Sequence, residues 1–432
     1  MRYRRIAALA VPMALQTALM LVGQVVVVAL IGRMGGGALY VQALYAPAEF
    51  LLVAVVNGFA VALQVATARR VGAGEPGAVA GYYGGLLALG VATYAVLAAA
   101  LIASAGALGG LVDVAPAEAE RFRSFLVAMV LVGSFRLGGE LCSAVLRGVG
   151  RGASAFGLTL TYVVLTTVGV AVFASGLAGV PVVAGVAGAV ELAAGLWLVT
   201  RAGLVTWAGV RKWPEDVVRL AAGVGLPVAA TYVLLFVVNL LLVRIVAIDG
   251  PAAVAGFNAG YTLQTAVLVP AIGFGSAIAV LVNQGVAGGD RSVAAAAFRR
   301  GMVLATAGYA VVTVVFVLYG VPLADLMAAD PAVVAEVRDF LAIMGPTFGC
   351  NGLVLVALTV VQQVGRGGAA VGLNLAYFVL VIVIGWLAVA DSGDARGLVV
   401  TMAVMGYASA VVGLPASVWL VRKVIRPALV TV

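Results

Sequence analysis

Four charged side chains stand inside long apolar stretches of this sequence, where a membrane helix would bury them. They are Glu49, Arg136, Glu140 and Glu191, and all four fall in the first half of the chain. A charge at the centre of a bilayer costs about 2.5 to 3.5 kcal/mol on insertion scales, so each is a candidate for function. A carboxyl group can carry a proton, and an arginine can bind an anionic group.

Glu49 is the strongest candidate for proton binding. It lies about two turns from the outer end of an apolar stretch, with Tyr45 nearby and no obvious basic partner. Burial disfavours a charged carboxylate, so we expect Glu49 to hold a proton at physiological pH. The i, i+4 spacing of Arg136 and Glu140 fits a charged element of a cavity, and it fits equally an ion pair that stabilises the protein.

The sequence repeats itself at a constant offset of 215 positions, the distance from Pro12 to Pro227. The shift aligns Gly35 with Gly250, Gly58-Phe59 with Gly273-Phe274, Gly74 with Gly289, Gly150-Arg151-Gly152 with Gly365-Arg366-Gly367, and Tyr162 with Tyr377. One offset over almost the whole chain indicates a duplicated unit. In a membrane protein, paired repeats predict a transporter with its site between the halves.

Polar residues recur at the same offset. Gln24 matches Asn239, Glu49 matches Gln264 and Arg136 matches Asn351, whereas Glu191 matches Gly406 and is interpreted as structural. We expect the matched residues to supply polar contacts in a cavity, although hydrogen bonding between helices is an equally physical use of the amides. Helical spacing adds two polar stripes: Gln16, Met20, Gly23, Gln24 and Val27, and then Gln42, Glu49, Asn57 and Gln64.

The composition places these residues in membrane helices. Hydrophobic residues make up 64% of the chain and charged residues 10%, with a mean hydropathy of +1.19. Because helices satisfy their own backbone hydrogen bonds in lipid, we predict an all-α integral membrane protein. Its twelve predicted spans cover about 6–31, 42–68, 79–107, 122–146, 154–178, 181–203, 219–246, 255–287, 300–322, 334–362, 368–390 and 397–421. Pro12 and Pro227 would bend the first and seventh spans, as suits a moving gate.

The charges indicate the topology. Most of the 25 Lys and Arg residues fall in segments that share one side if both termini are cytoplasmic. Six spans per repeat give two parallel repeats related by a pseudo-twofold axis along the membrane normal. The predicted organisation is a six-helix lobe over 1–205, a cytoplasmic linker over 206–218 and a second six-helix lobe over 219–432.

Several kinds of chemistry are excluded or disfavoured. The sequence has no histidine, so histidine catalysis and histidine-bound metals are excluded, and Cys142 and Cys350 lack metal-ligand spacing. No span holds paired carboxylates, and no glycine loop of the phosphate-binding type is present. We therefore predict no catalysis, no cofactor, no metal and no nucleic-acid partner, with a membrane-embedded enzyme or scaffold kept as an alternative.

The ordered motifs resemble the multidrug and toxic compound extrusion family, in the superfamily that includes polysaccharide and lipid-linked oligosaccharide flippases. They are Ile6-Ala7-Ala8-Leu9-Ala10-Val11-Pro12, Ile31-Gly32-Arg33-Met34-Gly35, Leu146-Arg147-Gly148-Val149-Gly150, Leu226-Pro227 and Gly365-Arg366-Gly367. The resemblance implies a V-shaped monomer of two lobes and alternating access driven by protons or sodium. It also implies export of amphipathic, often cationic, compounds.

The chain departs from the family at its ion sites. Val27, Leu235 and Asn351 stand where members of the family carry carboxylates. Glu49, Arg136 and Glu140 are the candidate replacements. We expect a proton-coupled exporter of organic compounds, such as drugs or natural products, in the cytoplasmic membrane. A flippase for lipid-linked saccharides or peptidoglycan precursors is the alternative, because an intramembrane arginine suits a pyrophosphate head group.

Overall fold

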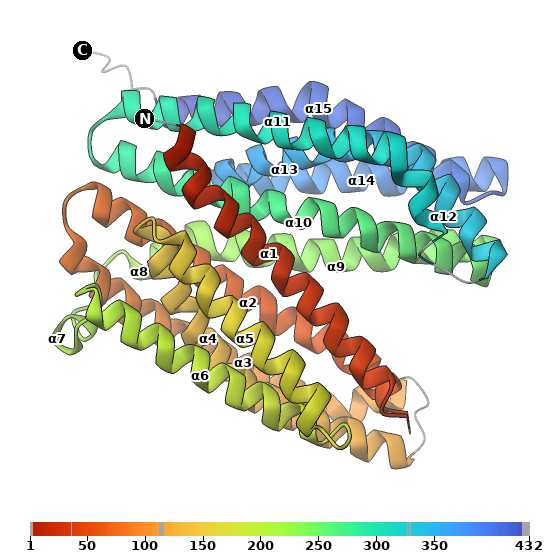
Figure 1. Ribbon diagram of the computed structural model, residues 1–432, viewed down its shortest axis with the longest axis horizontal. Helices are drawn as coiled ribbons and strands as arrows, with labels where there is room; N and C mark the ends of the chain where they lie inside the picture. Colours follow the sequence, from red (N-terminus) through yellow and green to blue (C-terminus); the bar gives the residue numbers. More distant parts are fainter. Residues whose placement is uncertain (1–2, 36, 112–115, 326, 328–329, 426–432) are drawn as a thin grey trace. The chain divides into compact units, whose positions relative to one another are not determined.

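The first half of the chain forms six long helices in the computed structural model, which describes residues 3–35, 37–111, 116–325, 327 and 330–425 (Figure 1). The helices are α1 (Tyr3–Gly32), α2 (Ala38–Gly72), α3 (Val79–Leu111), α4 (Pro116–Gly148), α5 (Gly152–Phe173) and α6 (Gly179–Arg201). Their apolar composition and their lengths allow each of them to cross a bilayer.

The second half repeats this pattern with more interruptions. It comprises α7 (Trp207–Val210), α8 (Val217–Leu220), a π-helical turn (Ala221–Gly225), α9 (Leu226–Val246), α10 (Pro251–Ala287), α11 (Arg291–Ala324), α12 (Pro331–Met344), α13 (Phe348–Val361), a second π-helical turn (Gln362–Arg366), α14 (Gly367–Ser392) and α15 (Arg396–Ile425). Among the described residues, eleven segments are long and apolar enough to span a membrane. One of them, Pro331–Ser392, has 62 residues, enough for two spans, and changes direction at Gly365. The prediction of an all-helical membrane protein with six spans per repeat is therefore confirmed.

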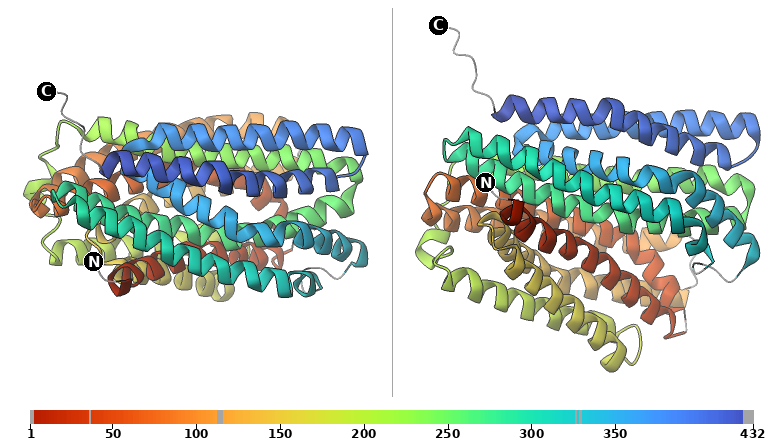
Figure 2. Two further views of the ribbon diagram at one scale, coloured as in Figure 1. Left: turned by 90° about the horizontal axis from the view of Figure 1, so that it is seen from above. Right: turned by 45° about the horizontal axis from the view of Figure 1, so that its top comes forward.

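The described chain divides into two compact units. The N-unit comprises residues 15–232 and 287–289, and the C-unit comprises residues 3–14, 233–286 and 290–425. Within the N-unit α4 packs against both α2 and α6, and within the C-unit α15 packs against both α13 and α14. Figure 2 shows α13, α14 and α15 of the C-unit side by side.

The first and seventh helices each contribute to both units. Residues 3–14 of α1 belong to the C-unit, and residues 226–232 of α9 belong to the N-unit. Glycines allow the close approach of backbones in each unit. A Cβ atom at Gly58 would lie 2.8 Å from the Gly225 carbonyl oxygen, and a Cβ atom at Gly273 would collide with the Met13 carbonyl oxygen. Because Gly58 and Gly273 match in the repeat, glycine allows the close approach of another backbone at equivalent positions of the two halves.

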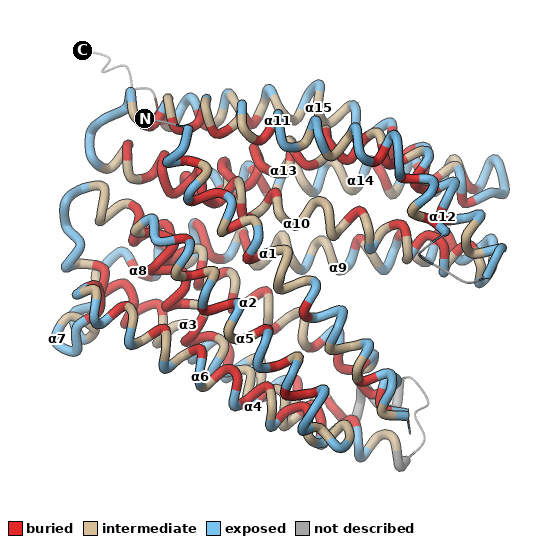
Figure 3. The backbone as a smooth tube through the Cα atoms, viewed as in Figure 1, coloured by how far each residue is buried: buried red, intermediate tan, exposed pale blue. Residues whose placement is uncertain are grey.

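Matching stretches of α2 and α10 are fully buried within the two units (Figure 3). Every residue from Ala62 to Ala68 is buried in α2, and every residue from Ala277 to Asn283 is buried in α10. The two stretches stand at the same offset of 215, since 277 − 62 and 283 − 68 both equal 215. The duplicated sequence therefore places a buried helix segment at an equivalent position in each unit.

The repeated glycines terminate equivalent helices. Gly35 and Gly250, Gly74 and Gly289, and Gly150 and Gly365 all have positive φ, with φ 91° at Gly150 and φ 97° at Gly365. At Gly150 the Arg151 amide donates to the Leu146 carbonyl at 2.8 Å, and the Gly150 amide donates to the Arg147 carbonyl at 2.9 Å. This is the Schellman arrangement, in which glycine avoids the steric cost of a left-handed residue.

We expect Gly150→Ala and Gly365→Ala each to destabilise the protein by about 1 to 2 kcal/mol, since the cost comes from φ alone. The control is Gly157→Ala, inside α5, where a Cβ atom would meet nothing within 4 Å. That change should be neutral or slightly stabilising. Thermal unfolding in detergent measures the three effects, and equal midpoints for Gly150→Ala and Gly157→Ala would contradict the expectation.

The predicted linker over 206–218 packs on α3. A side chain at Gly81 or Gly84 would collide with the carbonyl oxygens of Lys212 and Val210, and the Tyr82 hydroxyl donates to the Asp216 carboxylate at 2.7 Å. These contacts tie the linker to the N-unit.

Prolines occupy the predicted positions in the first and seventh helices. Pro12 lies inside α1, and Pro227 is the second residue of α9, directly after the π-helical turn Ala221–Gly225.

The turn between α10 and α11 is fixed by Asp290, whose carboxylate accepts from the Ser292 hydroxyl at 2.7 Å and from the Val293 amide at 2.9 Å. These bonds hold the pKa of Asp290 below its usual range, so this cap is lost only in acid.

Candidate functional site

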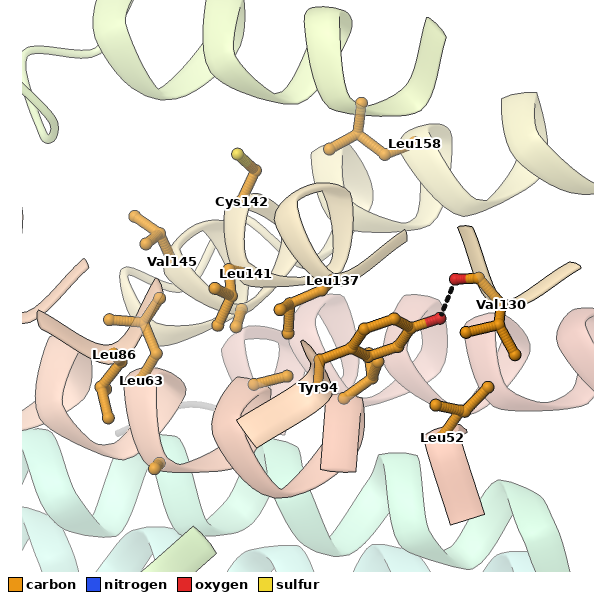
Figure 4. Close-up of a cluster of buried hydrophobic side chains, with 14 of the residues drawn as sticks. Leu52, Leu63, Leu86, Tyr94, Val130, Leu137, Leu141, Cys142, Val145 and Leu158 are labelled. Carbon is orange, nitrogen blue, oxygen red and sulfur yellow. Dashed lines mark hydrogen bonds between the residues drawn. The ribbon is translucent and has the colours of Figure 1, made fainter. Parts of the chain in front are cut away.

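Helix α4 presents an apolar face and a polar face within the N-unit. Leu137, Leu141 and Val145 follow one another at four-residue spacing, and all three are fully buried. Figure 4 shows them in the cluster with Leu63, Leu86 and Tyr94, whose hydroxyl donates to the Val130 carbonyl at 2.9 Å. Arg136, Glu140 and Arg147 occupy other positions of the same helix, so a dry core and a charged cluster share one element.

Glu140 forms its ion pair with Arg147. Arg147 Nη2 lies 2.7 Å from Glu140 Oε1, and Arg147 Nε donates to Gln64 Oε1 at 2.7 Å. The side chains of Arg147 and Glu140 are only 9% and 14% exposed. The i, i+4 spacing suggested an ion pair between Arg136 and Glu140, and the structure corrects this. Glu140 pairs instead with Arg147, seven residues further along α4, which also donates to the Gln64 amide on α2. Glu140 thus neutralises the arginine that holds α4 to α2.

Arg136 contacts different residues from those that Glu140 and Arg147 contact. Its guanidinium carbon is 4.5 Å from the ring centroid of Tyr162 on α5, within the range of a cation–π contact. Its Nη2 atom also approaches the sulfur of Met20 on α1 at 3.7 Å. The four ion pairs found among the described residues do not include Arg136. Arg136 is therefore a half-buried cation with an aromatic ring on its face and no carboxylate in direct contact.

The predicted polar stripe of α1 faces α5 in part. Gln16 Nε2 donates to the Thr159 hydroxyl at 2.8 Å, and a Cβ atom at Gly23 would lie 2.6 Å from Val163. These contacts place Gln16 and Gly23 against α5, whereas Met20 contacts Arg136 on α4. Gln24, one turn further along α1, is exposed.

Glu49 is half-buried in α2 and has one weak partner. Gln42 Nε2 donates to Glu49 Oε2 at 3.4 Å, a long hydrogen bond. Tyr45, one turn away, is buried at 3% exposure, with its ring edge-on to Phe125 at 5.4 Å. The arrangement leaves Glu49 free of a direct basic partner, as the sequence suggested, although Arg136 lies within electrostatic range.

Glu191 is buried on α6, at the contact with α4. It is 2% exposed, and its Oε2 atom has no hydrogen-bond partner. A Cβ atom at Gly139 would lie 3.1 Å from the same carboxylate oxygen, so the carboxyl group packs against the glycine beside Glu140. The sequence alone suggested a structural role, but a buried carboxyl oxygen without a partner is costly to keep for structure.

The C-unit holds the matching neutral residues. Asn239 lies within hydrogen-bonding reach of Tyr261, and Gln264 is 7% exposed with its Oε1 atom unpartnered. Asn351 Nδ2 donates to the Thr347 hydroxyl at 3.2 Å. Each residue sits in a helix interior of the C-unit, and the charged cluster has no equivalent at these three positions.

Several polar partners were missed at the sequence level. Tyr162 and Thr159 lie on a helix with no charge, and only the match of Tyr162 with Tyr377 marked the first of them. In the C-unit, Gln363 Nε2 donates to the Ser276 hydroxyl at 2.6 Å, and Asn283 Nδ2 donates to the Gln363 carbonyl at 3.0 Å. Gln363 escaped notice because the predicted span ended at residue 362.

The charged cluster is suited to binding and proton exchange. Within the described residues, no group of three or more His, Cys, Asp or Glu side chains is placed to hold a metal ion. A cavity of about 210 Å³ next to Arg69, Tyr82 and Asp216 lies at the Gly72 end of α2, away from Glu49 and Arg136. The cluster therefore offers a cation, a weakly bonded carboxyl group and a buried carboxyl group on neighbouring helices.

The comparisons with known proteins agree with this architecture. The family model MatE matches residues 12–173 and 227–387, two segments whose first residues differ by 215. No curated protein matches the chain.

Two solved structures illustrate the similarity of fold. The Vibrio cholerae MATE transporter VcmN in its bent form is 17% identical, with a TM-score of 0.88 and coverage of 98% of this chain and 97% of that one. A transporter of the MOP superfamily from Pyrococcus furiosus is 15% identical, with a TM-score of 0.89 and the same coverage. It is described as having a binding pocket of reverse polarity that suggests a different function.

Proposed function

The chain belongs to the MatE family and is a membrane transporter of the MATE type, and from this premise we propose that it is a proton-coupled exporter. The proposed substrates are amphipathic organic compounds, and the proposed mechanism is alternating access. The protein would act as a monomer in the cytoplasmic membrane with both termini in the cytoplasm. Residues 1–2 and 426–432, at the two ends, lie outside the described residues.

The observation that supports this proposal best is the position of Glu49. It is a half-buried carboxyl group in a membrane helix, its one hydrogen bond is long, and Arg136 lies within electrostatic range without pairing to it. A carboxyl group in these surroundings can exchange a proton without first breaking a strong ion pair. The Glu140–Arg147 pair stabilises the same helices and leaves Glu49 available.

Transport in proteoliposomes tests the proposal. The full chain would be reconstituted with a pH gradient, with ethidium and dansylundecanoic acid as cationic and anionic probes. We expect uptake of at least one probe to exceed that of empty liposomes and to collapse when a protonophore is added. Uptake that persists without the pH gradient but follows an imposed sodium gradient would contradict proton coupling, and uptake that depends on neither would contradict secondary active transport.

A flippase for lipid-linked saccharides is the second candidate. Arg136 favours it, because a guanidinium without a carboxylate partner suits a phosphate-bearing head group. Movement of a fluorescent lipid phosphate between leaflets, in the same proteoliposomes and without the dansyl probes, distinguishes this function from export.

A further inference from the structure

Arg136 has hydrogen-bond donors that the protein does not use. A guanidinium carries five N–H donors in a planar fork. The described contacts are a weak one to the Met20 sulfur at 3.7 Å and the Tyr162 side chain, whose ring lies 4.5 Å away and whose hydroxyl is within hydrogen-bonding reach. Arg136 also stands 12 residues, about 18 Å of helix, before the end of α4 at Gly148. Donors at this distance from the helix end need acceptors other than lipid.

The nearby carboxyl groups do not supply these acceptors. Glu140 is paired with Arg147 at 2.7 Å, and Glu49 accepts from Gln42. Glu191 lies within electrostatic range of Arg136, but the two form no ion pair, and Glu191 Oε2 is unpartnered. A cation with open donors and a carboxyl group with an open oxygen therefore sit on the two helices that pack together as α4 and α6.

The repeat shows that this charge separation is specific to the N-unit. At the offset of 215, Arg136 corresponds to Asn351, and Glu191 corresponds to Gly406. In the C-unit Asn351 fills the space beside Gly406, where a Cβ atom would lie 2.8 Å from Asn351 Oδ1. In the C-unit this helix contact is therefore made by a neutral amide against a glycine. In the N-unit the matching positions hold Arg136 and Glu191, two charged residues that form no ion pair with each other.

We propose that Arg136 is the subsite for an anionic oxygen group of the transported molecule, a carboxylate or a phosphate, so that the substrate is an organic anion. This inference rests on the proposed transport function. The Tyr162 ring lies over the guanidinium at 4.5 Å, and a guanidinium in this position can bind a carboxylate or a phosphate through two parallel N–H···O bonds. Glu191 would repel an anion at this site, and compete for Arg136, only in its ionised form.

Binding to the purified full chain in detergent tests the subsite without any gradient. The probes are dansylundecanoic acid, its neutral amide and dansylundecylamine, which share one body and differ in the head group. We expect the wild type to bind the acid at least about tenfold more tightly than the amide, the effect of one to two charge-assisted hydrogen bonds. Equal affinities for acid and amide would overturn the proposal.

Variants identify the residue. Arg136→Gln should remove the preference for the acid, and Arg136→Lys should retain part of it, since an ammonium keeps the charge and loses the fork. At a pH high enough to ionise Glu191 in the wild type, Glu191→Gln should strengthen binding of the acid and not of the amide. The matched control is Arg123→Gln, an exposed arginine on the same helix, which should behave as the wild type. An unchanged preference for the acid in Arg136→Gln would overturn the assignment. If Arg136→Gln fails to fold, the two single variants Arg136→Lys and Glu191→Gln decide it, and an acid preference equal to that of the wild type in both would overturn it.

Two further arms identify the source of the anion. Titration with a short-chain phosphatidic acid asks whether a lipid head group competes with the dansyl acid for the Arg136-dependent site. Stronger competition by the lipid than by a soluble arylcarboxylate assigns the anion to a head group, and the reverse assigns it to a small molecule. An anion preference without proton-dependent uptake would refute the proposed coupling alone, whereas proton-dependent uptake of ethidium without an anion preference would refute the subsite alone.

Discussion

Glu49→Gln is expected to reduce proton-driven uptake to the level of empty liposomes while leaving probe binding in detergent within about twofold of the wild type. The amide has nearly the shape of the carboxyl group and can still bond to Gln42, but it cannot bind and release a proton. The measurement compares uptake driven by a pH gradient with binding of the same probe. Loss of one with retention of the other separates coupling from folding and from substrate recognition.

The matched control for this change is Glu120→Gln, which removes an exposed carboxyl group from α4 of the same unit. It should transport at the wild-type rate. If Glu49→Gln also transports at that rate, Glu49 has no part in coupling. Glu191→Gln, tested in the same assay, then decides whether the buried carboxyl group on α6 carries the proton instead.

The duplicated sequence predicted much of the fold because matched residues carry the same local constraint twice. Gly150 and Gly365 both end helices with positive φ, and Gly58 and Gly273 both admit a neighbouring backbone. Such requirements depend on the residue's own conformation or on its missing side chain, so they are visible in one sequence. The membrane class followed from the apolar composition, and the family from the repeat together with the ordered motifs; both are confirmed.

The partners in the candidate site depended on packing between helices, which spacing along one helix does not reveal. Glu140 is four residues from Arg136 and seven from Arg147, and it pairs with the more distant one because Gln64 on α2 holds Arg147 in place. The aromatic ring that contacts Arg136 is that of Tyr162 on α5, a helix with no charged residue that would have marked it as part of the site. The contribution of residues 3–14 to the C-unit is likewise a property of tertiary contacts alone. The roles of the site residues stay predictions.

Arg147→Met is expected to be the most destabilising single change in the cluster, by about 3 to 5 kcal/mol. It removes the ion-pair partner of the buried Glu140 carboxylate and the Arg147 hydrogen bond to Gln64. Glu140→Met, which leaves Arg147 its bond to Gln64, should cost less. The double variant should recover most of the loss, because two apolar side chains of similar volume remove both desolvation costs.

Thiol labelling of Cys142 during heating, in a Cys350→Ala background, measures these differences, because Cys142 is fully buried and becomes reactive only when the N-unit opens. The control is Arg151→Met, an exposed arginine just beyond α4, whose midpoint should match the wild type. A double variant as unstable as Arg147→Met would mean that Arg147 acts mainly through Gln64. Glu140 would then have no ion-pair partner of consequence.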